Sequence, residues 1–243
     1  VMDMVEGRIL WDPRLPDIPR EGRRAIFEAK ISTLAKLHNA DYEAIGLGDF
    51  GKPGNYFSRQ ISRWTKQYQM SETQTIGTMN KLIDWLPNNI PDDDANSTVH
   101  GDFRLDNMVL HADKPEVLAV LDWELSTLGH PLGDFTYHLM QWFMPSDGAS
   151  TQTLEGADFD ALNIPDATEY TRLYCEHTGR DSIENMDFYI AYNMFRLAGI
   201  LQGIVGRVRD GTASNEHAAM MEDRVKPLSD VGWFYAQKAG AVG

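Results

Sequence analysis

The residues with the clearest potential for chemistry lie between His100 and Asp122. His100 and Asp102 form a His-x-Asp pair, Asn107 follows five residues after Asp102, and Asp122 ends an apolar run. Phosphoryl transfer needs a carboxylate that receives a hydroxyl proton and hard oxygen ligands that hold magnesium against phosphate oxygens. The pattern indicates Asp102 as the catalytic base, supported by His100. Asn107 and Asp122 are the expected ligands of Mg²⁺ on ATP.

A small antiparallel hairpin is expected to bring these groups together. Residues 107–110 and 117–121 are short β-branched or apolar runs, and residues 111–116 form a turn between them. Paired antiparallel strands place the start of the first beside the end of the second. Asn107 and Asp122 should therefore lie at one end of the hairpin, where Asp102 can also reach.

The elements around the hairpin are predicted to be mostly helical, which gives an α+β, mostly α fold class. Apolar residues at three- and four-residue spacing predict helices over residues 21–39, 56–69, 73–86, 166–178, 182–206 and 214–237, with another that begins at Pro131. Residues 1–5 are expected to be a strand. The glycine-rich residues 40–55 lack the spacing of a phosphate-binding loop and are expected to be a surface connector. His38, which ends the first helix, is expected to bond the catalytic loop or to cap the helix.

Composition limits the partners and the compartment. The net charge of −14 argues against a nucleic-acid polymer or an anionic membrane as the main partner, although magnesium and a few local donors still allow a nucleotide. Residues 188–208 are apolar but contain two arginines, so we expect a buried helix there. No signal peptide is evident, and the single Cys175, expected to be a buried helix residue, fits a cytoplasmic location.

A metal-dependent hydrolase is the main chemical alternative. His130, Asp134 and His138 recur every four residues, which places them along one face of a helix, and with His100 and Asp102 they could bind zinc or iron. Their neighbours are apolar residues suited to a core, and Asp134 in the first helical turn is typical of an acceptor for loop amides. The sequence therefore favours phosphoryl transfer over metal-dependent hydrolysis.

The chain resembles a known superfamily along nearly its whole length. The motifs that carry the resemblance to the aminoglycoside phosphotransferase and choline kinase-like superfamily are His100-Gly-Asp102 with Asn107, Leu-Asp122-Trp-Glu124, and Gly129-His-Pro131 followed by Asp134. A closer resemblance, to the kinase-like module associated with acyl-CoA dehydrogenases, lies in Leu37-His38, Gly46-Leu-Gly-Asp-Phe-Gly51 and Trp123-Glu-Leu-Ser-Thr-Leu-Gly129.

This resemblance implies the C-terminal lobe of a protein-kinase-like fold. Residues 1–10 would be the hinge strand and linker, and residues 11–243 a single C-terminal lobe. The hinge residues that meet adenine through their backbone would be Met2, Asp3, Met4 and Val5. The N-terminal lobe, with its phosphate-covering loop and lysine, is expected to precede Val1. The resemblance also assigns Asp102 as base and Asn107 and Asp122 as metal ligands.

The sequence thus predicts an ATP- and Mg²⁺-dependent phosphotransferase that acts on the hydroxyl of a small molecule. The closer resemblance suggests a hydroxyacyl compound or its CoA thioester as the acceptor. The acidic balance of the chain mildly disfavours such an acceptor unless Arg104, Arg207, Arg209 or Arg224 lines the pocket. Arg104 could contact the γ-phosphate or the substrate, or it could form a salt bridge within the loop. A non-catalytic kinase-like binding module is a further alternative, and the oligomeric state stays open.

Overall fold

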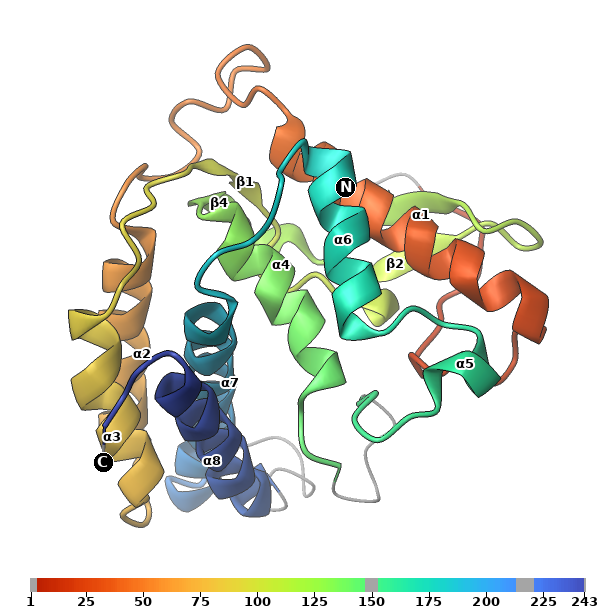
Figure 1. The fold of residues 1–243 in the computed structure, drawn as a ribbon. Helices are drawn as coiled ribbons and strands as arrows, with labels where there is room; N and C mark the ends of the chain where they lie inside the picture. Colours follow the sequence, from red (N-terminus) through yellow and green to blue (C-terminus); the bar gives the residue numbers. More distant parts are fainter. Residues whose placement is uncertain (1–3, 147–152, 213–220, 243) are drawn as a thin grey trace. The chain divides into compact units, whose positions relative to one another are not determined.

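The chain folds into two compact units. The structure is a computed structural model that describes residues 4–146, 153–212 and 221–242 (Figure 1). The first unit combines Val1–Gly54 with Ala95–Glu184, and the second combines Asn55–Asp94 with Asn185–Gly243. The described chain is mainly helical and contains small antiparallel sheets, which confirms the predicted fold class.

The helices of the first unit pack through aromatic side chains. They are α1 (Arg20–Asn39), α4 (Pro131–Leu139), α5 (Phe159–Leu162) and α6 (Ala167–Thr178), with the single-turn η4 (Met140–Trp142) after α4. Helix α6 lies across α1 (Figure 1). Phe135 stacks on Tyr174, and Phe27 meets both Trp142 and Tyr170 edge-on. These contacts join α1, α4, η4 and α6 in one buried aromatic core.

Two short sheets complete the first unit. Strand β2 (Met108–Leu110) pairs with β3 (Val117–Val120), and Met108 lies opposite Val120 in an antiparallel register. This confirms the predicted hairpin. Strand β1 (Ser97–Val99) pairs with β4 (Thr127–Gly129), a sheet that the sequence did not predict. Single-turn helices η2 (Leu105–Asn107) and η3 (Trp123–Leu125) lead into β2 and follow β3.

The start of the described chain has no regular secondary structure and is largely exposed. Met4 and Val5 belong to no described strand, although a strand was expected there, because no described segment pairs with their backbone. Pairing begins at Arg8, which exchanges two backbone hydrogen bonds with Leu110, at 2.8 and 2.9 Å. Gly7 permits this approach, since a Cβ there would lie 2.4 Å from the Leu110 carbonyl oxygen.

The second unit is built from helices alone in its described residues. They are α2 (Tyr56–Ser71), α3 (Gly77–Trp85), η1 (Leu86–Asn88), α7 (Met186–Arg209) and α8 (Glu222–Lys238). Helix α7 packs on both α2 and α8, and most of its residues are buried, as the sequence predicted. In the described ranges, no helix combines the length and apolar character needed to cross a membrane. The beginning of the helix expected over 214–237 falls partly outside the described residues.

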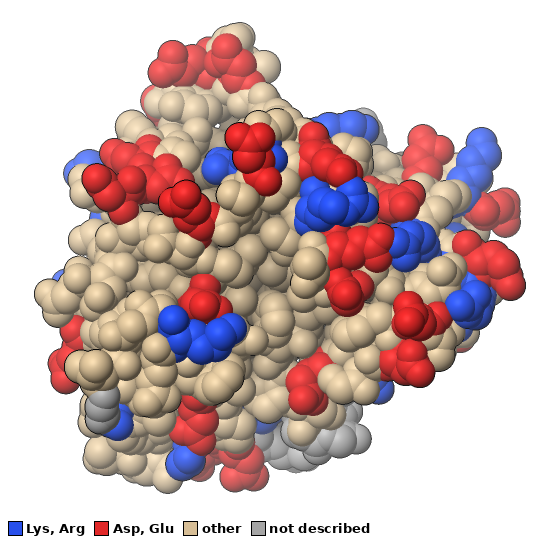
Figure 2. All heavy atoms as spheres, viewed as in Figure 1, with Lys and Arg blue, Asp and Glu red and all other residues tan. Residues whose placement is uncertain are grey.

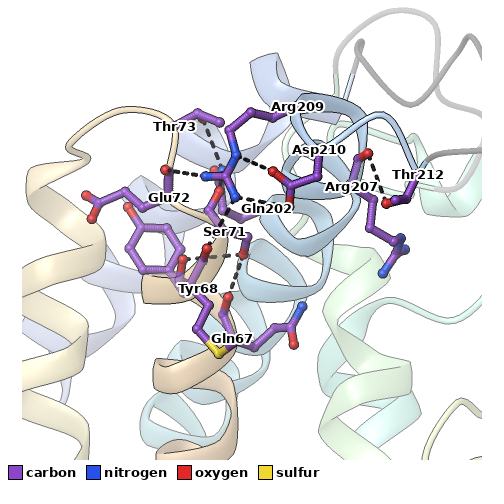
Figure 3. A network of polar contacts seen from close by, with 11 residues as sticks. Gln67, Tyr68, Ser71, Glu72, Thr73, Gln202, Arg207, Arg209, Asp210 and Thr212 are labelled. Carbon is purple, nitrogen blue, oxygen red and sulfur yellow. Dashed lines mark hydrogen bonds and ion pairs between the residues drawn. The ribbon is translucent and has the colours of Figure 1, made fainter.

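A polar network fixes the C-terminal end of α2 (Figure 3). The Gln202 amide donates to the Ser71 carbonyl at 2.7 Å, and Arg209 donates to the carbonyls of Met70 and Glu72 at 3.4 and 3.2 Å. Arg209 also pairs with Asp210. These bonds satisfy carbonyls that a helix end leaves unpaired, and they commit the Arg209 guanidinium to a structural role.

Candidate active site

The predicted catalytic loop, His100–Asn107, is closed by hydrogen bonds from the Asn107 side chain. Its amide nitrogen donates to the Asp102 backbone carbonyl at 2.9 Å and to the Asp102 carboxylate at 3.2 Å. Asn107 is buried at the end of η2, whereas the Asp102 side chain keeps 17% of its surface exposed. The loop therefore presents Asp102 in a fixed position with access to solvent.

His100 joins this loop to the end of β3. Its Nδ1 accepts the Asp102 backbone N–H at 3.2 Å, so its Nε2 is free to donate to the Leu121 carbonyl at 2.8 Å. The Leu121 backbone N–H donates in turn to the Asn107 carbonyl at 2.8 Å. Asp122 follows directly, with left-handed backbone angles (φ 62°, ψ 53°) that turn the chain away from the strand. The hairpin thus places Asp122 beside the start of β2, as its register requires.

A buried carboxylate anchors the loop from below. Asp134, in the first turn of α4, is fully buried and accepts the backbone N–H groups of His100 and Gly101 at 2.7 and 2.9 Å. His38 of α1 donates to the same carboxylate at 3.2 Å and also bonds the Tyr174 hydroxyl at 2.7 Å. Asp134 is therefore an acceptor for loop amides, and His38 bonds the catalytic loop through it.

The electrostatics of Asp134 favour its charged form. Burial by itself would raise the pKa of the Asp134 carboxyl, but the hydrogen bond and charge of His38 and the two backbone N–H groups together lower it below its usual range. The anchor therefore stays ionised at neutral pH. A charged acceptor makes stronger hydrogen bonds than a neutral one, so the loop is held firmly.

Position 101 requires a glycine, both because of its backbone conformation and because neighbouring atoms leave no room for a Cβ. Its φ of 86° lies in the left-handed region, and a Cβ there would lie 2.7 Å from the Leu125 carbonyl oxygen. The loop therefore turns sharply between the two residues that carry the His-x-Asp pair.

Arg104 forms salt bridges within the loop. Its Nε lies 3.4 Å from Asp102 Oδ1, and its second guanidinium nitrogen lies 3.1 Å from Asp106 Oδ2. The Arg104 side chain is one-third exposed, so the same guanidinium also faces solvent. Of the two roles that the sequence left open, the structure shows the loop salt bridge.

The oxygen atoms suited to a magnesium ion are those of Asn107 and Asp122. The Asn107 amide nitrogen is used by Asp102, which leaves its Oδ1 as an acceptor, and the Asp122 carboxylate has no hydrogen-bond or ion-pair partner in the described ranges. Magnesium in such sites takes one or two protein carboxylates and completes its shell with water and phosphate oxygens. The donor set fits Mg²⁺ on a nucleotide.

The residues that would bind metal in a metal-dependent hydrolase each make a separate structural hydrogen bond. His130 Nδ1 accepts the Leu132 N–H at 3.2 Å, Asp134 holds the loop, and His138 Nε2 bonds the Tyr170 hydroxyl at 2.9 Å. Within residues 4–146, 153–212 and 221–242, no three His, Cys, Asp or Glu side chains are grouped to hold a metal ion. The geometry gives the hydrolase alternative no support.

The proposed hinge lies at the margin of the structure. Met2 and Asp3 fall outside the described residues, and Met4 and Val5 are 87% and 41% exposed. Their assignment to adenine stays a prediction.

Cys175 is buried on α6, and burial raises the pKa of its thiol, so it is not an activated nucleophile.

Two residues near the site had not been singled out from the sequence. Asp106 pairs with Arg104 inside the loop, and Lys30 of α1 is buried with 1% of its surface exposed. One sequence signal for Lys30 was available: it lies within three or four residues of Ile26, Phe27, Ile31 and Leu34, on the apolar face of the helix. A lysine at that position is unusual and indicates a special environment.

The charge of the surface agrees with the composition. Asp and Glu side chains are spread across the face shown in Figure 2, with Lys and Arg side chains interspersed among them. The anionic groups of a nucleotide would therefore depend on a bound cation and on local donors such as Arg104.

Comparison with known proteins identifies relatives along the whole chain. Acyl-CoA dehydrogenase family member 10 of Mus musculus is 41% identical over 240 residues, which cover 99% of this chain and 22% of that protein. Acyl-CoA dehydrogenase family member 11 of Homo sapiens is 39% identical over 234 residues, covering 96% of this chain and 30% of that protein. The chain therefore spans less than a third of these relatives.

Solved structures show the same fold. A crystal structure from Ralstonia eutropha JMP134, provisionally described as an aminoglycoside phosphotransferase, is 52% identical and has a TM-score of 0.93, covering 98% of this chain and 72% of that one. The aminoglycoside phosphotransferase APH(4)-Ia, in a ternary complex with AMP-PNP and hygromycin B, is 15% identical with a TM-score of 0.57, and covers 93% and 70%. At that identity it shows likeness of fold alone.

A family model assigns the chain directly. The model described as the phosphotransferase enzyme family matches residues 1–173, which include the catalytic loop, the hairpin and the Asp134 anchor. Together with the 52% identical structure and the 41% identical relative, this match shows that the chain belongs to the phosphotransferase enzyme family.

Proposed function

We propose that this chain supplies the catalytic base and the metal ligands of an ATP- and Mg²⁺-dependent phosphotransferase that acts on a small-molecule hydroxyl. One observation carries the proposal. Asp102 is accessible to solvent, and the Asn107 amide holds it at the same end of the hairpin that bears Asp122. A proton acceptor and a set of oxygen ligands at one point are what phosphoryl transfer requires of the protein.

Each loop residue has a defined part in this reaction. Asp102 orients the acceptor hydroxyl and receives its proton, while Asn107 and His100 keep the carboxylate in place. Asn107 Oδ1 and the Asp122 carboxylate are the groups that would hold Mg²⁺, which supplies charge neutralisation to the phosphates when bound. Arg104, beside Asp102, is placed to stabilise negative charge that develops during transfer.

The acceptor class is proposed from the relatives. The named acyl-CoA dehydrogenase family members support a hydroxyacyl compound or its CoA thioester. Because Arg209 caps α2, its guanidinium is committed to a structural role and Arg209 is a poor candidate for binding such an anionic acceptor (Figure 3). The nucleotide complex of APH(4)-Ia supports ATP as the donor.

The test uses the full-length protein that contains this chain. ADP formation is measured with Mg²⁺ and ATP in the presence of a hydroxyacyl-CoA thioester, the free hydroxy acid, or an aminoglycoside. We expect acceptor-dependent ADP formation with a hydroxyacyl compound and its loss when EDTA removes the metal. Nucleotide binding without ADP formation for any acceptor would instead favour the non-catalytic binding module.

A further inference from the structure

A buried tyrosine of α6 contacts the histidine that supports the catalytic loop. The Tyr174 side chain is fully buried, and its hydroxyl oxygen lies 2.7 Å from His38 Nδ1. Phe135 of α4 stacks on the Tyr174 ring, with the two ring centroids 4.0 Å apart and the ring planes at 12°. The hydroxyl is therefore held in a fixed position against the His38 ring.

The Asp134 carboxylate decides which nitrogen of His38 carries a hydrogen. His38 Nε2 lies 3.2 Å from Asp134 Oδ2, and an ionised carboxylate can only accept hydrogen bonds. His38 must therefore bear a hydrogen on Nε2. In the neutral imidazole Nδ1 then has no hydrogen, so it can only accept a bond from Tyr174.

The Tyr174 hydroxyl is suited to donate that bond. Burial raises the pKa of the Tyr174 phenol well above its usual range, although the charge of Arg180 opposes this change. The phenol therefore keeps its hydrogen at neutral pH. The result is a directed pair of hydrogen bonds, in which Tyr174 O–H donates to His38 Nδ1 and His38 Nε2–H donates to Asp134.

These bonds lead to the catalytic loop. The Asp134 oxygen that accepts from His38 also accepts the His100 N–H at 2.7 Å. The other Asp134 oxygen accepts the Gly101 N–H at 2.9 Å, and Asp102 follows Gly101 directly. A change in how His38 meets Asp134 therefore alters the acceptor on which the loop amides depend.

We propose that Tyr174 is a positioning residue for phosphoryl transfer: its hydroxyl orients the His38 ring so that Nε2–H meets Asp134. Asp134 in turn places the loop that carries Asp102. The inference rests on the proposed function. Without the hydroxyl, the buried His38 Nδ1 loses its donor, and the imidazole is no longer held at both nitrogens. The loop is then placed less precisely, which slows transfer more than it weakens nucleotide binding.

The kinetic test compares Tyr174→Phe with Tyr170→Phe in the full-length protein. Tyr170 lies one turn earlier on α6 and is equally buried, and its hydroxyl bonds His138 at 2.9 Å. Each variant therefore loses one buried bond between a hydroxyl and a histidine. Of the two histidines, His38 is the one that bonds Asp134.

We expect Tyr174→Phe to lower kcat about fivefold while the KM for ATP stays within about twofold of wild type, because one hydrogen bond that positions the loop is lost. Tyr170→Phe should keep kcat within about twofold of wild type. Equal values of kcat in the two variants would overturn the proposal.

A double-mutant cycle tests whether Tyr174 acts through His38. Tyr174→Phe is made again in a His38→Leu background, which has no ring nitrogens. We expect no further loss of kcat, because the path from the hydroxyl to Asp134 is already broken. A further loss of about fivefold in that background would show that Tyr174 acts by packing alone, and would also overturn the proposal.

Two measurements without turnover keep the inference separate from the proposed function. The His38 ring nitrogens are observed by NMR at about pH 8 in protein labelled with ¹⁵N-histidine. We expect a hydrogen on Nε2 and none on Nδ1, and an Nδ1 signal that shifts in Tyr174→Phe but not in Tyr170→Phe. A hydrogen on Nδ1 in wild type, or an Nδ1 signal unchanged in Tyr174→Phe, would overturn the inference.

The second measurement is hydrogen exchange at the Gly101 amide, which donates to Asp134. We expect this amide to exchange about fivefold faster in Tyr174→Phe than in Tyr170→Phe, because its acceptor is held less firmly. Equal exchange in the two variants would overturn the inference. If no acceptor is turned over, the proposed function fails, and the NMR and exchange results alone decide whether Tyr174 positions the loop.

Discussion

Replacing Asp134 by asparagine tests the anchor of the catalytic loop. The carboxylate accepts hydrogen bonds from His100 N–H, Gly101 N–H and His38, and it is fully buried. An asparagine keeps one acceptor oxygen and turns its NH₂ group towards a backbone N–H, which can only donate, because His100 and Gly101 donate to different oxygens. At least one buried donor is then unpaired, and the charge that strengthened the other bonds is lost.

The expected loss is about 3–5 kcal/mol in the free energy of unfolding, the range for removing one partner of a buried charged pair. Urea denaturation of Asp134→Asn followed by tryptophan fluorescence measures this value. Asp113→Asn, in the exposed hairpin turn, is the matched control and should stay within about 0.5 kcal/mol of wild type.

The difference in stability between wild type and Asp134→Asn should also depend on pH. The pKa of Asp134 is lowered in the folded state, so the unfolded state binds more protons and the stabilisation is fully present above the unfolded pKa of about 3.9. It is lost as pH falls through the folded pKa, and the gap between wild type and Asp134→Asn should then narrow. A loss below about 1 kcal/mol at pH 7, or a gap that widens in acid, would refute this account of the anchor.

Three further predictions concern the loop, the buried lysine and the metal ligands. Gly101→Ala should lower the unfolding temperature more than Gly156→Ala, because both residues have positive φ but only Gly101 has a carbonyl within 3 Å of the added Cβ; equal losses would contradict the clash. Lys30→Met should remove a pH dependence of up to about 5 kcal/mol in the free energy of unfolding. Because Lys30 binds more protons in the unfolded state, wild-type stability rises between pH 7 and 10.5. Urea-denaturation profiles of wild type and Lys30→Met that stay parallel across this pH range would contradict this. Asp122→Ala should weaken Mg²⁺-dependent nucleotide binding in calorimetry at unchanged stability, and wild-type affinity would exclude Asp122 as a ligand.

The local parts of the fold could be predicted from the sequence. The hairpin follows from two apolar runs joined by a short turn, and its register alone brings Asn107 and Asp122 to one end. Helix α1 follows from its apolar spacing. The α3 helix begins later than expected, at Gly77, because Thr73 instead bonds Glu222 and the Gln202 side chain.

The parts that depend on distant contacts could not be predicted. Strands β1 and β4 have three residues each and lie about 30 residues apart in the sequence, so neither carries a local signal of pairing. Burial of Lys30 and the division of Arg104 between two carboxylates arise only when α1, α4, α6 and the loop are assembled. Asp134 could be predicted in part. Its position in the first turn of a helix indicated an acceptor for backbone amides, but its contact with His38 depends on how α1 packs against α4.

The role of Asp102 is tested most directly by phosphoryl transfer in Asp102→Asn. The turnover of full-length wild type, Asp102→Asn and the control Asp113→Asn is measured with Mg²⁺, ATP and the accepted hydroxyl compound, together with nucleotide affinity. We predict that Asp102→Asn loses about 10²–10⁴-fold in kcat, because an asparagine amide cannot receive the hydroxyl proton, while it binds nucleotide within a few-fold of wild type. Turnover of Asp102→Asn at the wild-type rate would contradict the assignment of Asp102 as the catalytic base.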